Sequence, residues 1–188
     1  MLKRRILQVG LAIVLMAAPV TASTFVAMDQ AELVAASDAV IQGEVLEVYS
    51  FWNREGNAVV TEARVSVEEV VAGQAPAEVV VRTFGGEVGD YVLEAHGFPT
   101  FQEGQRLLLF LHQAPDSTLR VTGYRLGEYR IARGDQGQMI AMPTLEPGVR
   151  LLHPDGKPAP RPEVVPLETF KSQIRGLAAG APARDRVK

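Results

Sequence analysis

The sequence predicts a small all-β barrel, preceded by one short helix and followed by one amphipathic helix. Between Ala39 and Met142 apolar and polar residues alternate with a period of two, and no stretch repeats well every 3.6 residues. Glycine-rich and polar turns separate these alternating stretches. The run from Leu107 to Leu111 is apolar on both faces, which is typical of a central strand buried on both sides.

The composition indicates one ordinary globular domain. The chain has 188 residues, a formal net charge of -3, 47% hydrophobic residues and 22% charged residues. Because the sequence has no cysteine, it excludes a disulfide framework, a thiolate zinc site, a Cys nucleophile and a bacterial lipoprotein anchor. The charge balance gives no reason to expect nucleic-acid binding. No motif calls for a cofactor.

Residues 1–22 have the layout of a secretory signal peptide. Three basic residues, Lys3 to Arg5, precede an apolar run from Ile6 to Ala18, and Val20 to Ala22 offer small residues for cleavage. The apolar run is short for a membrane-spanning helix, which needs about 20 residues. We therefore expect a periplasmic or secreted bacterial protein with no stable membrane insertion after signal removal. The alternative is a signal retained as an N-terminal anchor.

The domain predicted at 23–142 begins with a helix. Asp29 and Glu32 form a capping box, so a short helix should run to Ala36. A strand follows from Ala39 to Tyr49, and its alternation slips just after Gly43, as a bulge or bend would produce. Ser50–Gly56 is a polar turn, and Gly85–Asp90 is a glycine-rich loop. Further strands are expected at Asn57–Val71, Glu78–Phe84, Tyr91–Ala95, Gln105–His112, Leu119–Leu126, Glu128–Ala132 and Gln138–Met142.

The C-terminal part divides into three segments. Seven of the twelve prolines fall in residues 143–166, which predicts an extended, irregular segment. Leu167, Phe170, Ile174 and Leu177 recur at helical spacing and predict an amphipathic helix over 167–180, packed on the sheet. Residues 181–188 are polar and are expected to form a disordered tail.

Four stretches of the chain carry a resemblance to a known family. They are Ser37–Val45, Val65–Gly73, Val79–Val81 and Phe101–Leu111. Over about half the chain this order resembles netrin-like domains, the group that includes the tissue inhibitors of metalloproteinases. The resemblance implies an OB-type five-stranded barrel. Those inhibitors reach the catalytic metal with an N-terminal cysteine, and this sequence has none, so their mechanism transfers to no residue here.

Catalytic and metal-binding patterns are weak in this sequence. The three histidines have no metal-ligand spacing, and no Gly-x-Ser-x-Gly motif occurs. Glu94 and His96 would share one face of a strand and are the only hint of a hydrolytic pair. A hydrogen-bonded or solvated His96 is the commoner situation. We therefore expect a non-enzyme with no catalytic residues, no metal site and no cofactor.

The candidate binding residues are Phe51, Trp52 and Arg54. They lie in the expected turn between the first two barrel strands, where OB-type barrels often contact ligands. Large aromatic residues there could anchor a partner protein. Alternatively, both rings fold down and plug the open end of the barrel. The leading hypothesis is an exported binding module that engages another protein through barrel loops. The alternatives are a structural envelope component without a discrete ligand, and a hydrolase accessory or weak enzyme that uses Glu94 and His96.

The signal peptide generates the first testable prediction. Cleavage after Ala22 should give a mature protein that begins at Ser23 and is found outside the cytoplasm. N-terminal sequencing of the exported protein checks this directly. An exported protein that still begins at Met1 would show that the signal is retained.

Overall fold

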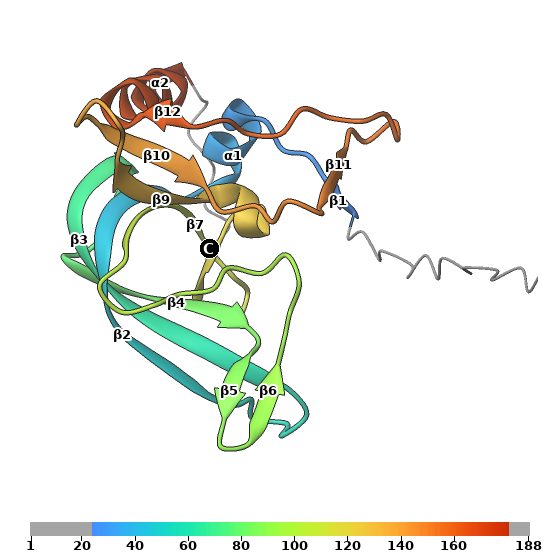
Figure 1. Cartoon of the computed structure of the whole chain (residues 1–188). Coiled ribbons are helices and arrows are strands. Elements are labelled where there is room, and N and C mark those ends of the chain that lie inside the picture. Colours follow the sequence, from blue (N-terminus) through green and yellow to red (C-terminus); the bar gives the residue numbers. More distant parts are fainter. Residues whose placement is uncertain (1–23, 181–188) are drawn as a thin grey trace, which may run out of the picture.

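The computed structural model describes residues 24–180. The predicted signal peptide (1–22) and the predicted disordered tail (181–188) lie outside the described residues. Fifteen elements follow one another along the chain (Figure 1): β1 (Thr24–Val26), α1 (Gln30–Ala36), β2 (Ala39–Trp52), β3 (Val59–Gly73), β4 (Glu78–Phe84), β5 (Gly86–Val88), β6 (Tyr91–Leu93), β7 (Arg106–Gln113), β8 (Leu119–Val121), η1 (Tyr124–Gly127), β9 (Glu128–Arg133), β10 (Met139–Pro143), β11 (Arg150–Leu152), β12 (Val165–Pro166) and α2 (Leu167–Gly180).

Five strands close into a barrel, which confirms the predicted all-β barrel with a short helix and a C-terminal helix. The ring runs β2, β3, β4, β8, β7 and back to β2. Each neighbouring pair is antiparallel except β4 and β8, which are parallel and joined by the single pair Val81–Leu119. At this coarse level the barrel is consistent with an OB-like fold. The join between β4 and β8 is its weakest seam.

The first barrel strand bends, as its slipped alternation predicts. The pairing of β2 with β3 shifts register three times: between Val40 and Ile41, between Gln42 and Gly43, and between Val45 and Glu47. A Cβ atom on Gly43 would lie 2.3 Å from the carbonyl oxygen of Ser66. Glycine is therefore required at this close approach of the two strands.

Strand β7 is buried on both faces and contributes to two hydrophobic cores. Leu107, Leu109 and Leu111 point into the barrel, where they pack with residues of β2, β3 and β4. Leu108 and Phe110 point the other way, into a core formed with both helices, β9 and β10. Successive side chains of a strand face opposite sides, so one apolar run holds the barrel and the outer layer together.

The outer layer covers one side of the barrel (Figure 1). Strands β9, β10 and β12 continue the sheet beyond β7, and α1 and α2 pack against one another above it. The Asp29–Glu32 capping box is present at the start of α1, as predicted. Lys171 of α2 is buried and donates hydrogen bonds to Gln42 at 3.1 Å and to Glu69 at 2.8 Å. These bonds tie α2 to β2 and β3.

Several elements differ from the sequence prediction. Strand β2 extends to Trp52, so Phe51 and Trp52 lie in a strand and not in the expected turn. The expected loop at 85–90 contains β5, which pairs with β6 in a short hairpin. The strand expected at 119–126 stops at Val121, and the 3-10 turn η1 follows. The proline-rich segment contains β11, which pairs in parallel with β1. Each of these features depends on contacts between segments that are not visible in a local pattern.

The buried strand generates a stability prediction. Leu109→Ala should lower the free energy of unfolding by about 2–5 kcal/mol, because Leu109 is fully buried and its truncation leaves a cavity. Denaturant unfolding of the variant measures this change. A loss under about 1 kcal/mol would mean that the barrel interior collapses around the smaller side chain without cost.

Candidate functional site

The long β2–β3–β4 sheet has two faces, and each carries a candidate site. Cross-strand partners share a face, and neighbours along a strand alternate between faces. Tyr49, Phe51 and Phe84 lie on the outer face, away from the barrel interior. Ser50 and Thr61 lie on the inner face, where a cavity opens. The outer face is therefore aromatic, and the inner one carries hydroxyl groups.

The structure separates the three residues predicted to bind a partner. Phe51 lies on the outer face, where its ring stacks on Tyr49 with centroids 5.6 Å apart. Trp52 is on the inner face and packs against Tyr91 of β6 at 4.8 Å, with 41% of its surface exposed. Arg54 is exposed in the turn and makes no hydrogen bond or ion pair with another described residue. Trp52 does not line the cavity at the barrel end; it packs between two hairpins.

Aromatic rings, three of them exposed and two half-buried, extend across the outer face. We define the aromatic belt as Tyr49, Phe51, Phe84, Phe98 and Tyr124. Its first part follows the strand pairing, since Phe51 and Phe84 are both paired with Val60. Its second part leaves the sheet: Phe84 and Phe98 are 5.5 Å apart, and Phe98 and Tyr124 are 4.9 Å apart. The belt thus extends from β2 and β4, across Val60 of β3, to the segment before β7 and the segment after β8.

The second part of the belt lines a groove beside the weak β4–β8 seam. The groove has a volume of about 590 Å³ and is bordered by Phe84, Phe98 and Tyr124 together with Pro99 and Pro115. Tyr124 has a φ angle of 57°, a left-handed conformation that is rare for a bulky residue. Its ring is half exposed. Tertiary packing therefore holds an aromatic side chain at this edge against a local backbone preference.

Charged groups accompany the belt. Arg82 lies 5.7 Å from the centre of the Phe51 ring and donates hydrogen bonds to Glu62, at 2.6 Å for the shorter one. The same guanidinium is 3.8 Å from Asp116 in the β7–β8 hairpin. Hydrogen bonds from Thr118 lower the pKa of Asp116 to about 2, and the hydrogen bond and charge of Arg120 add to the shift. The belt therefore carries paired charges of both signs at its centre.

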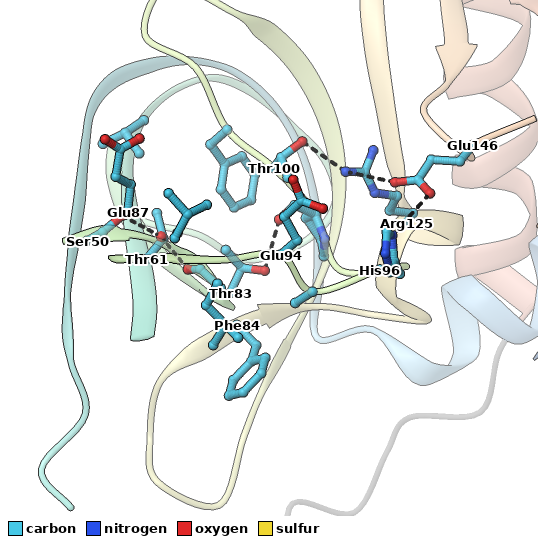
Figure 2. Close-up of a pocket in the computed structure, with 18 residues that line it drawn as sticks. Ser50, Thr61, Thr83, Phe84, Glu87, Glu94, His96, Thr100, Arg125 and Glu146 are labelled. Atoms are coloured by element: carbon cyan, nitrogen blue, oxygen red, sulfur yellow. Dashed lines mark hydrogen bonds and ion pairs between the residues drawn. The ribbon is translucent and has the colours of Figure 1, made fainter. Parts of the chain in front are cut away.

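The inner face borders a cavity of about 510 Å³ (Figure 2). The cavity lies between the end of the barrel, the β5–β6 hairpin and the connector 94–101. Figure 2 shows three hydroxyl residues, Ser50, Thr61 and Thr83, on one side, and Arg125, His96 and Glu146 on the other, with Glu94 between them. Its volume is within the range of about 300–1,000 Å³ that small-molecule sites occupy.

Arg125 holds the cavity wall together. Its guanidinium donates to the carbonyl oxygen of Phe98 at 2.8 Å, to that of Thr144 at 3.2 Å and to the hydroxyl of Thr100 at 3.0 Å. It also lies 3.7 Å from Glu146. A planar guanidinium with several rigid donors can fix three separate segments in this way. Arg125 thus positions the connector that closes the cavity.

The predicted pair of Glu94 and His96 lines this cavity, but the two side chains do not form a bonded pair. The Nδ1 atom of His96 faces Glu146 at 3.9 Å, and His96 is largely exposed. Within residues 24–180, Glu94 has no hydrogen bond or ion pair. No cluster of three or more His, Asp or Glu residues in this part of the chain could hold a metal ion.

Sequence reasoning missed Phe84, Tyr124 and Arg125. The alternation predicted that Phe84 ends a strand, yet it gave no sign that this ring would meet Phe98. Tyr124 was expected inside a strand, and Gly123 was the only local signal of a left-handed turn there. Arg125 had no signal at all, because its partners are 19 to 27 residues away in sequence.

Comparisons with known proteins do not assign a function to these surfaces. No family model matches the chain, and no curated protein matches it significantly. Within the described residues, no helix has both the length and the apolar character needed to cross a membrane.

A buried carboxyl group lies behind the cavity wall. Glu128, at the start of β9, is 2% exposed, and its carboxylate accepts a hydrogen bond from Thr144 at 2.8 Å. Burial raises its pKa to about 7 from an ordinary 4.5, although the Thr144 hydrogen bond and the charges of Arg125 and Arg130 oppose the shift. The native protein therefore retains a proton that the unfolded chain releases at lower pH.

This proton makes the stability of the protein depend on pH. The contribution of Glu128 to the free energy of unfolding should fall as the pH rises from about 4.5 to about 7, because ionisation of a buried carboxyl group is unfavourable. Relative to the wild type, the free energy of unfolding of Glu128→Gln should increase by up to about 3 kcal/mol between pH 5 and pH 8, because the glutamine has no proton to lose. Denaturant unfolding at both pH values measures this difference. Glu55→Gln, at an exposed turn, is the control, and equal pH dependence of all three proteins would contradict the assignment.

Proposed function

We propose that this protein is an exported, non-enzymatic binding module that engages another protein through the aromatic belt. The single observation that carries the proposal is the belt itself: five rings from β2, β4 and two connecting segments, which form two contacting groups on either side of Val60. Tyr49 is 64% exposed although it lies within strand β2. Aromatic and arginine side chains dominate the energetics of protein interfaces, and Arg82 lies against the Phe51 ring.

The charges around the belt favour a protein partner over a membrane or a nucleic acid. Arg82 is paired with Glu62, and Arg64 is paired with Glu47 and Glu78, so the outer face has no unbalanced positive charge. Nucleic acids and anionic membranes both select for such a positive surface. A mixed rim of paired charges around exposed rings is the usual composition of a protein interface.

The signal-like segment and the barrel architecture also bear on where and how this protein acts. The signal-like segment 1–22 supports export, and a bacterial periplasmic or secreted location is part of the proposal. The OB-like barrel agrees with the resemblance to netrin-like domains at the level of architecture. Since the N-terminal cysteine of the metalloproteinase inhibitors is missing, the proposal does not include metalloproteinase inhibition.

The hydroxyl groups of the cavity support a non-enzymatic role. Thr61 donates its proton to the carbonyl oxygen of Gly85, and Thr83 donates to that of Pro99. Among residues 24–180, neither hydroxyl has a basic side chain as a hydrogen-bond partner, which an activated nucleophile requires.

The belt predicts which substitutions weaken partner binding. A photo-crosslinking amino acid at position 49 should capture the partner from the producing bacterium, and one at exposed Val164 should not. Against the purified partner, Tyr49→Ala and Phe84→Ala should each lower the affinity about 30-fold, which corresponds to a hot-spot contribution of about 2 kcal/mol. Val164→Ala, which lies beside β12, is the matched control. Trp52→Ala and Arg54→Ala test whether the interface extends to the end of the β2–β3 hairpin.

Thermal unfolding separates binding from folding in this experiment. Both Tyr49 and Phe84 are exposed, so their variants should keep the wild-type melting temperature within a few degrees. A partner that crosslinks equally from positions 49 and 164, or binds both belt variants with wild-type affinity, would rule out the belt as the interface.

A further inference from the structure

The cavity on the inner face has a hydrogen-bonding character that selects for one class of ligand. The side chains that line it offer mainly hydrogen-bond acceptors to a ligand, because most of their N–H and O–H donors already bond to other groups of the protein. We propose that this cavity binds an organic cation, an ammonium or guanidinium group on a hydrocarbon stem, with Glu94 as its counter-ion. This inference does not rest on the aromatic belt: Phe84 borders both sites, but the groups argued below to bind the cation are not belt residues.

Three of the four hydroxyl groups that line the cavity, those of Ser50, Thr61 and Thr83, have no proton left for a ligand, whereas Thr100 accepts from Arg125 and keeps its own. Thr61 donates to the carbonyl oxygen of Gly85 at 2.7 Å, so Ser50, whose Oγ lies 2.7 Å from Thr61 Oγ1, must donate to Thr61. Thr83 donates to the carbonyl oxygen of Pro99 at 3.0 Å. A hydroxyl group has one proton and two lone pairs, so Ser50 and Thr83 retain only acceptor capacity.

The local backbone preserves this arrangement. A Cβ atom on Gly86 would lie 2.2 Å from Thr61 Oγ1 and 2.5 Å from Ser50 Oγ. Gly86 also has a φ angle of 133°, which side-chain-bearing residues rarely adopt. The start of β5 therefore lies directly against the two hydroxyl groups and keeps them in place.

The positive groups of the cavity are also engaged. Arg125 uses its guanidinium for Phe98, Thr100 and Thr144, and its remaining neighbour is Glu146. His96 faces the same Glu146. Three of the five N–H donors of Arg125 hold the cavity wall, and both Arg125 and His96 face the carboxylate of Glu146, so an anionic ligand would meet a like charge there.

Two carboxylates remain for a cation. Glu87 and Glu94 line the cavity, and neither has a hydrogen bond or ion pair with another described residue. Glu94 lies between the hydroxyl groups and the Arg125 cluster in Figure 2, where it can accept from a ligand bound at the centre. An ammonium or guanidinium group carries several donors and no acceptor, which complements acceptors of this kind.

The apolar walls suit a hydrocarbon stem. Val48, Leu93, Ala95 and Phe101 line the cavity together with Val92 of the β5–β6 hairpin. Burying a methylene group against such walls stabilises a complex by about 0.8 kcal/mol. The ligand source could be a free alkylamine or the basic side chain of a peptide, since the recognised group is the same.

Matched six-carbon probes test the proposal on the full mature protein. Hexylamine should bind saturably in calorimetry at pH 7 and should shift the amide NMR signals of Thr61, Thr83 and Ala95. Hexan-1-ol and hexanoate have the same stem and should bind at least about tenfold more weakly, because they lack the charged donor. A blocked lysine, Nα-acetyl-lysine N-methylamide, distinguishes the sources: tighter binding than hexylamine indicates a peptide side chain, and weaker binding indicates a free amine.

Two glutamate variants with the same charge change provide the internal control. Glu94→Gln should weaken hexylamine binding about tenfold, because it removes one charge-assisted hydrogen bond. Glu55→Gln, at the exposed turn after β2, should stay within about twofold of the wild type. Ser50→Ala should weaken binding by a smaller factor. Hexanoate binding as tightly as hexylamine, amide shifts confined to residues outside the cavity, or equal affinities of both glutamate variants would overturn the proposal.

Discussion

The burial of β7 on both faces is the constraint on which the rest of the structure depends. One edge of β7 pairs with β2, and the other pairs with β9 along its first half and with β8 along its second half. The barrel and the outer layer therefore share one strand, and each core excludes water from one side of it. If β7 moved, both the ring of five strands and the platform beneath α1 and α2 would lose their packing.

The alternation of the long β2–β3–β4 sheet explains why two different surfaces lie so close together. Phe51 and Ser50 are neighbours in sequence, yet one belongs to the aromatic belt and the other to the cavity. The strand pairing turns Thr83 toward Thr61 and Phe84 toward Val60, although Phe84 also borders the cavity. Beside the β5–β6 hairpin the inner face carries hydroxyl side chains and borders the cavity, instead of being filled by large apolar side chains. The sheet thus lies between the surface that we propose for a protein partner and the cavity that we propose for a small cationic group.

The sequence allowed part of the candidate surfaces to be predicted. Phe51 was selected because an aromatic residue stood near a turn between two strands, and the structure places its ring in the aromatic belt. Trp52 was selected for the same reason, but alternation turns it to the inner face against Tyr91. Glu94 and His96 were paired on one strand face, whereas His96 in fact faces Glu146, 50 residues further along the chain. A prediction from spacing fails when the nearest partner comes from another segment.

The sequence by itself determined the features that depend on neighbouring residues. Period-two alternation predicted the main strands, the capping box predicted α1, and the helical spacing of Leu167, Phe170, Ile174 and Leu177 predicted α2. These patterns reflect hydrogen bonds and burial over a few residues. Only the tertiary structure decided the parallel join of β4 and β8, the pairing of β1 with β11, the hairpin across the barrel end and the contacts of Arg125. Each of these depends on segments distant in sequence meeting in space, and a local pattern contains no information about which distant segment will arrive there.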